Sequence, residues 1–169
     1  DDTGFAQLGC YGSDIDTPNI NKLAAGGVQF TNFHVTPVCS PTRAALLTGR
    51  SQHAVGMRGL SGWVTGFPNA TGKISNSAAT IAEVLRDEGY ATLCAGKWHL
   101  NPGTEISAAG PFDQWPLGRG FERFYGFLPG ETDQFSPELV RDNTHIDPPA
   151  TPEEGYHLSE DLVDQLLKM

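Results

Sequence analysis

Residues 36–50, Thr-Pro-Val-Cys-Ser-Pro-Thr-Arg-Ala-Ala-Leu-Leu-Thr-Gly-Arg, govern how this chain is expected to fold around its chemistry. Ser40 suits the N-cap of a short helix, the proline after it suits the first helical position, and Gly49 can end the helix. Cys39 would then lie immediately before a helix N-terminus, where unpaired backbone amides favour negative charge. Arg43, in the first turn, opposes the helix dipole. The pattern therefore predicts an anion between Cys39 and Arg43.

Helix-type and strand-type patterns alternate along the rest of the chain. Helices are expected at 17–27 and 159–168, strands or extended segments at 28–35 and 90–95, and a loop at 59–76. A capping box of Thr80 and Glu83 begins the clearest helix, and Gly89 marks its end. This alternation predicts an α/β sheet with parallel strands. Lys97 and His99 follow the strand at 90–95, where ligand sites of such sheets usually lie.

The chain is expected to be one part of a larger domain. It opens on Asp1-Asp2 without a methionine and ends inside a helical pattern, so residues 1–169 are interpreted as truncated at both ends. Within this part, residues 101–152 are punctuated by glycine, proline and aromatic residues. They are predicted to form a long, irregular and partly packed excursion.

Composition excludes several classes of protein. The net charge of −9 argues against a general nucleic-acid partner and against adsorption to an anionic membrane. Three cysteines without a Cys-x-x-Cys pair argue against a disulfide framework or a zinc cluster. An anionic substrate would need local positive charge in such an acidic chain, which gives weight to the few Lys and Arg residues near Cys39.

The stretch Cys39-Ser40-Pro41-Thr42-Arg43, with Leu47-Thr48-Gly49-Arg50 after it, resembles the Cys-x-Pro-x-Arg motif of type I sulfatases. The resemblance implies that Cys39 is oxidised to Cα-formylglycine by a formylglycine-generating enzyme. It also implies that the hydrated aldehyde is the nucleophile, and that Arg43 holds it.

Asp1 and Asp2 are the candidate metal ligands. Adjacent carboxylates suit a hard cation, although the two residues taken alone favour a solvated terminus. The sequence Asp-Asp-x-Gly-Phe-x-x-Leu-Gly-Cys-Tyr-Gly at 1–12 is similar to the metal motif of sulfatases. The resemblance implies Ca²⁺, with Mg²⁺ as the alternative, bound by Asp1, Asp2 and the modified Cys39.

A third stretch, Gly89-Tyr90-x-Thr92-x-x-x-Gly96-Lys97-Trp98-His99, is similar to the second sulfatase signature. Taken alone, it would be a loop with a packed tryptophan and a solvated lysine. The resemblance implies that Lys97 contacts the sulfate and that His99 supports the formylglycine. The implied fold is that of the alkaline phosphatase superfamily, a mainly parallel sheet flanked by helices and incomplete in this chain.

The leading hypothesis is a sulfuric ester hydrolase of the arylsulfatase type, acting on a small-molecule or saccharide sulfate ester. The family needs a further His, a metal-binding Asp with Asn or Gln, and a second Lys from beyond residue 169, so these residues alone are expected to turn over little or nothing. Asp142-Asn143 is assigned to a turn rather than to that metal site. Two alternatives stay open: a phosphonate or phosphate ester hydrolase of the same superfamily, and a non-catalytic Ca²⁺-binding module.

Overall fold

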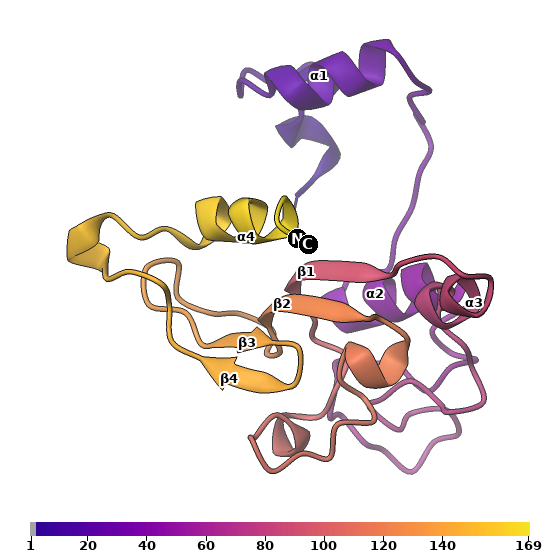
Figure 1. The fold of residues 1–169 in the computed structure, drawn as a ribbon. Helices are drawn as coiled ribbons and strands as arrows, with labels where there is room; N and C mark the ends of the chain where they lie inside the picture. Colours follow the sequence, from indigo (N-terminus) through magenta and orange to yellow (C-terminus); the bar gives the residue numbers. More distant parts are fainter. Residues whose placement is uncertain (1–2) are drawn as a thin grey trace. The chain divides into compact units, whose positions relative to one another are not determined.

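The structure is a computed structural model that describes residues 3–169, and it divides into two compact units (Figure 1). One unit is the chain up to Thr36, and the other runs from Pro37 to Met169. No helix in the described part of the chain is both long enough and apolar enough to cross a membrane.

The first unit contains two 3-10 turns and one α-helix. These are η1 (Phe5–Gln7), η2 (Gly9–Tyr11) and α1 (Pro18–Ala25). The Thr17 hydroxyl joins η2 to α1, because it accepts a hydrogen bond from the Gly9 amide at 2.9 Å and donates one to Asn21 Oδ1 at 3.0 Å. The helix predicted at 17–27 is confirmed. Residues 28–35 contain no strand, and most of their large apolar side chains are exposed.

The second unit is built on one mixed sheet. Its strands are β1 (Leu93–Lys97), β2 (Arg123–Phe127), β3 (Leu139–Arg141) and β4 (Thr144–Ile146), adjacent in that order. β1 and β2 are parallel, whereas β2–β3 and β3–β4 are antiparallel. The α/β prediction is confirmed, but this sheet is mixed rather than mainly parallel. Hairpin strands need only a tight turn, and Asp142-Asn143 forms it as predicted, with φ of 57° at Asp142.

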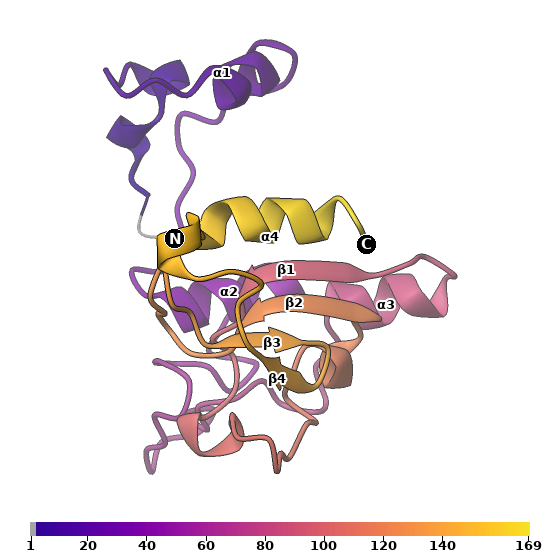
Figure 2. The ribbon, with the colours of Figure 1, turned by 60° about the vertical axis from the view of Figure 1, so that its left-hand side comes forward.

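Neighbouring residues of β2 point into two different cores. Phe124 is fully buried in a cluster with Ala44 and Trp98, whereas Tyr125 packs in a second cluster with Leu158. Successive side chains of a strand point to opposite faces of the sheet, so helices are needed on both faces. These helices are α2 (Cys39–Thr48), α3 (Ile81–Asp87) and α4 (Leu158–Leu166). Figure 2 shows α2 and α3 on one side of the sheet and α4 on the other.

The ends of α3 and α4 are set by local hydrogen bonds. The predicted capping box is present: Thr80 Oγ1 accepts from the Glu83 amide at 3.2 Å, and the Thr80 amide donates to Glu83 Oε2 at 2.6 Å. The helix predicted at 159–168 begins slightly earlier, at Leu158. Its N-cap is His157, because the imidazole Nδ1 accepts from the Ser159 amide at 3.2 Å.

The prediction that residues 101–152 lack regular structure is wrong for the strands. β2, β3 and β4 all lie in this segment, together with η3 (Gly103–Glu105) and η4 (Leu117–Arg119). These strands are only three to five residues long, too short for a strand periodicity to stand out between glycines and prolines. The loop predicted at 59–76 is confirmed, since it contains only the isolated bridge of Ala70 with Met57.

Candidate active site

Helix α2 presents its N-terminal turn to the end of β1. Val38 is extended (φ −140°, ψ 144°) and is the N-cap, so Cys39 is the first helical residue and the predicted cap at Ser40 is wrong. Ser40 is buried, and its hydroxyl instead accepts from the Ser61 amide at 3.1 Å, which ties the helix to the loop that follows it. The predicted stop is confirmed, because Gly49 adopts the left-handed conformation (φ 63°) and donates its amide to Ala45.

Cys39 lies against His99. The distance from Cys39 Sγ to His99 Nδ1 is 3.1 Å, although the two residues are sixty positions apart in the chain. The β1–β2 ladder positions the histidine, since the Trp98 amide donates to the Phe127 carbonyl at 2.9 Å and the His99 amide to the Leu128 carbonyl at 3.0 Å. His99 itself has φ of 49°, so the chain turns sharply at this residue.

Arg43 lies one helical turn after Cys39, on the same face of α2. Its Nε donates to the Trp98 carbonyl at 2.6 Å, and a terminal guanidinium nitrogen donates to the Lys97 carbonyl. Burial lowers the pKa of Arg43 from its ordinary value, and the nearby sulfur atoms of Cys94 and Cys39 oppose that change. The guanidinium therefore clamps the end of β1 while keeping its charge close to residue 39.

Burial shifts the pKa values of the titratable groups around residue 39. Burial lowers the pKa of His99 from 6.5 to about 4, with further lowering by the charges of Lys97 and Arg43. His99 is therefore neutral near pH 7 and can either donate or accept at Nδ1, according to its tautomer. Burial raises the pKa of Cys94 to about 11, so this partly exposed neighbour stays a protonated thiol.

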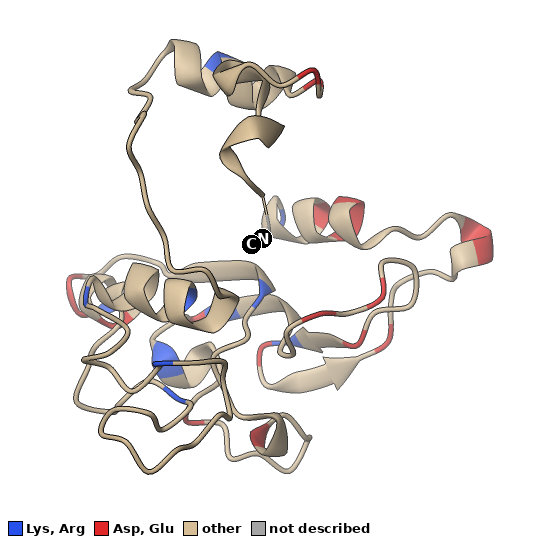
Figure 3. Ribbon diagram, turned by 180° about the vertical axis from the view of Figure 1, so that it is seen from behind, with Lys and Arg blue, Asp and Glu red and all other residues tan. Residues whose placement is uncertain are grey.

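Basic residues lie on α2 and at the end of β1, the two elements that meet at residue 39. Figure 3 shows Lys and Arg on α2, on η4 and at the end of β1, whereas Asp and Glu colour α4 and η5 (Pro152–Glu154). The local positive charge that an anionic ligand needs is thus present at the N-terminal turn of α2 despite the net charge of −9.

Of the site residues predicted from sequence, Cys39 contacts His99, and Arg43 donates to the backbone of Trp98, the residue before His99. Lys97 is half-buried as the last residue of β1, and its carbonyl accepts from Arg43. Asp1 and Asp2 lie outside the described residues. From Thr3 onward, no group of three or more His, Cys, Asp or Glu side chains is arranged to hold a metal ion. The metal ligands remain a prediction.

Sequence reasoning missed the segment that supports His99. A Cβ atom at Gly130 would lie 2.7 Å from His99 Cε1 and 2.9 Å from Nε2, so the ring packs directly on the glycine. The only signal was a glycine a few residues after a strand, which also describes an ordinary turn. His53 is exposed, and its backbone amide donates to Ser51 Oγ at 3.4 Å.

Comparison with known proteins places this arrangement in context. A family model described as Sulfatase matches residues 1–169. Human arylsulfatase A is 44% identical over 92% of this chain, and human steryl-sulfatase is 42% identical over 83%. The chain spans only 28% and 26% of these two relatives, about a quarter of each.

Two solved structures are also similar to this chain in fold. The crystal structure of Ps i-CgsB superposes on 99% of this chain with a TM-score of 0.76 and 27% identity, and the chain covers 40% of it. The complex of Ps i-CgsB with k-i-k-neocarrahexaose matches with a TM-score of 0.76 and 26% identity over 100% of this chain and 40% of that one. The structural neighbours have the alkaline phosphatase-like fold that the sequence motifs imply.

Proposed function

The chain belongs to the sulfatase family, and on this basis we propose that the protein hydrolyses a sulfate ester to an alcohol and inorganic sulfate. The observation that carries the proposal is the contact of Cys39 with His99 beside Arg43, at the N-terminal turn of α2. A sulfate ester is an anion, and it is favoured by the positive end of the α2 dipole and by the Arg43 guanidinium one turn later.

Residue 39 is proposed to be the nucleophile. Sulfatases generally use a formylglycine, and Cys39 is the cysteine of the matching motif. As a hydrate, formylglycine supplies one hydroxyl that attacks sulfur and a second that allows sulfate to be eliminated. An unmodified thiol lacks the second hydroxyl, so a formylglycine-generating enzyme is the implied maturation partner.

The three other residues would act on charge and orientation. Arg43 donates to backbone carbonyls through Nε and one terminal nitrogen, which holds the guanidinium rigidly beside residue 39. Neutral His99 would orient the hydroxyls of residue 39 by hydrogen bonding through Nδ1. Lys97 is proposed to bind the sulfuryl oxygens. Such preorganised donors stabilise the charge that develops in the transition state.

Asp1 and Asp2, with modified residue 39, are the proposed ligands of a divalent metal, Ca²⁺ or alternatively Mg²⁺. Carboxylate oxygens are the donors that these hard cations prefer. A bound cation would offset the negative charge of the nucleophile and the sulfuryl group.

The substrate is proposed to be a small-molecule or saccharide sulfate ester. Arylsulfatase A and steryl-sulfatase are named for non-saccharide esters, whereas Ps i-CgsB was solved with an oligosaccharide bound. Because these relatives differ in leaving group, the likeness supports the sulfate ester more strongly than either kind of alcohol.

The test is a paired assay of the full-length protein, produced with a formylglycine-generating enzyme. Hydrolysis of 4-nitrophenyl sulfate well above that of an aryl phosphate diester is expected, and Cys39→Ala should abolish it. Mass spectrometry of the peptide containing residue 39 should show the aldehyde. Preference for the phosphate diester, or full activity of Cys39→Ala, would overturn the proposal.

A further inference from the structure

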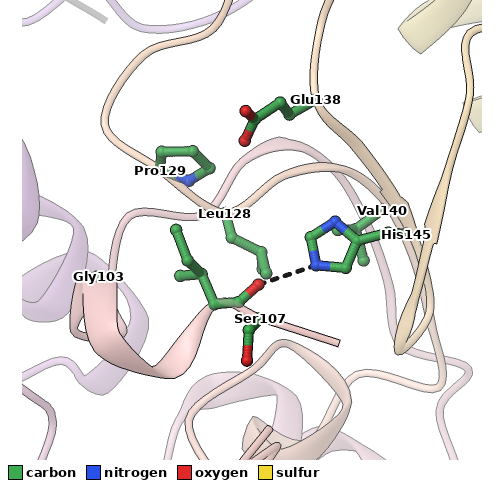
Figure 4. Close-up of a pocket in the computed structure, with 8 residues that line it drawn as sticks. Gly103, Ser107, Leu128, Pro129, Glu138, Val140 and His145 are labelled. Carbon is green, nitrogen blue, oxygen red and sulfur yellow. Dashed lines mark hydrogen bonds between the residues drawn. The ribbon is translucent and has the colours of Figure 1, made fainter. Parts of the chain in front are cut away.

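A cavity of about 270 Å³ lies in the second unit, between the β3–β4 hairpin, the segment after β2 and the loop around η3. Figure 4 shows the Glu138 carboxylate and the His145 ring facing the space beside Leu128 and Pro129. Its volume is close to the lower end of the range of about 300–1,000 Å³ that is typical of small-ligand sites. It is large enough for one ring of a ligand.

The base of this cavity is apolar and firmly packed. Leu128 and Val140 line it and are each only 1% exposed, and Ile106 and Pro129 add further apolar surface. Such a surface suits the C–H face of a ring, and the packing of Leu128 and Val140 in the core keeps it in place.

The polar side chains that line the cavity are His145, Glu138 and Ser107, and the Ser107 hydroxyl can both donate and accept. His145 Nε2 lies 2.8 Å from the Ile106 carbonyl, and since a carbonyl can only accept, Nε2 must carry the proton. In the neutral ring, Nδ1 is then an acceptor. An ionised Glu138 carboxylate also accepts only. A ligand here therefore meets two acceptors and one hydroxyl, and a carboxylate at Glu138 disfavours an anionic group. Uncharged hydroxyl groups on an apolar ring can donate and accept, and they carry no negative charge.

The cavity and the candidate active site share one segment of chain. Leu128 lines the cavity with its side chain, while its carbonyl accepts from the His99 amide at 3.0 Å. Two residues later, Gly130 packs on the His99 ring. The cavity wall is therefore continuous with the support of a residue that contacts Cys39.

From this geometry we infer that the cavity is a substrate subsite that binds an uncharged, hydroxyl-bearing sugar ring next to the sulfated group. The inference rests on the proposed function and specifies it, because it assigns the substrate to the saccharides. Glu138 is the residue that sets specificity, accepting from ring hydroxyls and opposing a second sulfate at this position.

The experiment compares Glu138→Gln with the unchanged full-length protein carrying modified residue 39. The probes are 4-nitrophenyl sulfate, a panel of monosulfated disaccharides built from glucose, galactose or N-acetylglucosamine, and the same disaccharides with a second sulfate on the neighbouring ring. Glu153→Gln is the matched control, because Glu153 is exposed on η5 and does not line the cavity.

The variant should change KM for the two kinds of saccharide in opposite directions. KM for the preferred monosulfated disaccharide should rise about tenfold, because a hydrogen bond to a charged acceptor is weakened. KM for the disulfated counterpart should fall, because the repulsion is removed. Values for 4-nitrophenyl sulfate should stay unchanged, and Glu153→Gln should alter none of the three.

Each contrary outcome would overturn either the subsite or the proposed function. Hydrolysis of 4-nitrophenyl sulfate with no gain in kcat/KM for any panel disaccharide would overturn the subsite and leave the proposed function intact. Equal effects of Glu138→Gln on all probes would do the same. Failure of the unchanged protein to hydrolyse any sulfate ester would overturn the proposed function itself.

Discussion

Arg43 and Arg119 are both withdrawn from solvent in the second unit, but their charges are satisfied differently. Arg119 is 3% exposed, donates to the Ala78 carbonyl at 2.6 Å and lies 3.5 Å from a carboxylate oxygen of Glu83. Arg43 donates to the carbonyls of Lys97 and Trp98. Over residues 3–169, the ion pairs found include none with Arg43.

The difference distinguishes a charge that is paired within the fold from one that we propose acts on a ligand. A guanidinium paired with a carboxylate is neutralised within the fold, and the pair joins α3 to η4. Carbonyl groups satisfy N–H donors without cancelling the charge, so the two hydrogen bonds of Arg43 do not neutralise its guanidinium. Burial lowers the pKa of Arg43, which means that the fold holds this charge at a cost in stability. Four substitutions test this comparison, in order of decreasing effect.

The largest effect is expected for Arg119→Met. It removes the partner of Glu83 and the hydrogen bond to Ala78, and should lower the free energy of unfolding by about 3 kcal/mol. This is near the lower end for a buried pair, because Glu83 keeps access to water. Chemical denaturation of the full-length protein measures the loss, and kcat of the folded protein should be unchanged. Unaltered stability would mean that the Arg119–Glu83 pair has no structural role.

Arg43→Lys should show the opposite behaviour. Lysine keeps the charge but lacks the planar fork that contacts two carbonyls, so the cation moves away from residue 39. We expect kcat/KM for 4-nitrophenyl sulfate to fall about 100-fold, the lower end for the loss of one transition-state donor. Stability should change by less than about 1 kcal/mol. A large loss of stability with full activity would assign Arg43 to the same class as Arg119.

Gly130→Ala tests whether Gly130 positions His99, the neutral side chain that contacts residue 39. The added Cβ would lie 2.7 Å from His99 Cε1, so the ring must move away from its contact with residue 39. A fall in kcat of about tenfold is expected, with little change in KM, because a small misplacement of an orienting group affects the transition state most. Gly66→Ala is the control, since no atom lies within 4 Å of its Cβ position. Equal kcat values for the two variants would refute this role of Gly130.

The smallest effect is expected for Tyr156→Phe, which removes a hydrogen bond to the carboxylate of Asp161. Asp161 accepts from the hydroxyls of Tyr125 at 2.7 Å and Tyr156 at 3.0 Å, and from Gln165 Nε2 at 3.1 Å. Tyr156→Phe removes one of these bonds and should lower the free energy of unfolding by about 1 kcal/mol, with no change in kcat.

Tyr156→Phe should also change how stability depends on pH in alkaline solution. Burial, followed by the hydrogen bond to Asp161, raises the pKa of Tyr156 above its ordinary value of 10. The unfolded chain therefore loses this proton first, and stability falls as the pH rises above about 10. Tyr125 behaves alike, since burial raises its pKa too. Denaturation at pH 9 and pH 11 should show a smaller fall for Tyr156→Phe than for the unchanged protein. An equal fall in both would contradict the assignment.

Local signals predicted the elements that depend on a few neighbouring residues. The Thr80–Glu83 capping box, the stop at Gly49 and the Asp142-Asn143 turn are confirmed because their hydrogen bonds or backbone conformations are determined within a few positions of the chain. The cap of α2 was misplaced by two residues and the start of α4 by one, because Val38 and His157 are not typical cap residues.

The pairing of strands in the sheet could not be predicted from such local signals. β2 pairs with β1, about thirty residues earlier in the chain, and β3 and β4 are three residues each. Pairing of this kind depends on burial of Phe124 and Tyr125 on opposite faces, which no local pattern in 101–152 reveals. The motif residues Cys39, Arg43, Lys97 and His99 could be selected from the sequence, but not the distances between them.

Residue types and their spacing were thus enough to indicate the family, the helix at residue 39 and the cation one turn after it, because these follow from chemistry within about ten residues. Folding of the whole second unit was needed to bring Cys39 within 3.1 Å of His99 and to press Gly130 against the imidazole. Those contacts arise where the β1–β2 ladder meets α2, and contacts between distant segments depend on packing and hydrogen bonding across the sheet rather than on any short stretch of chain.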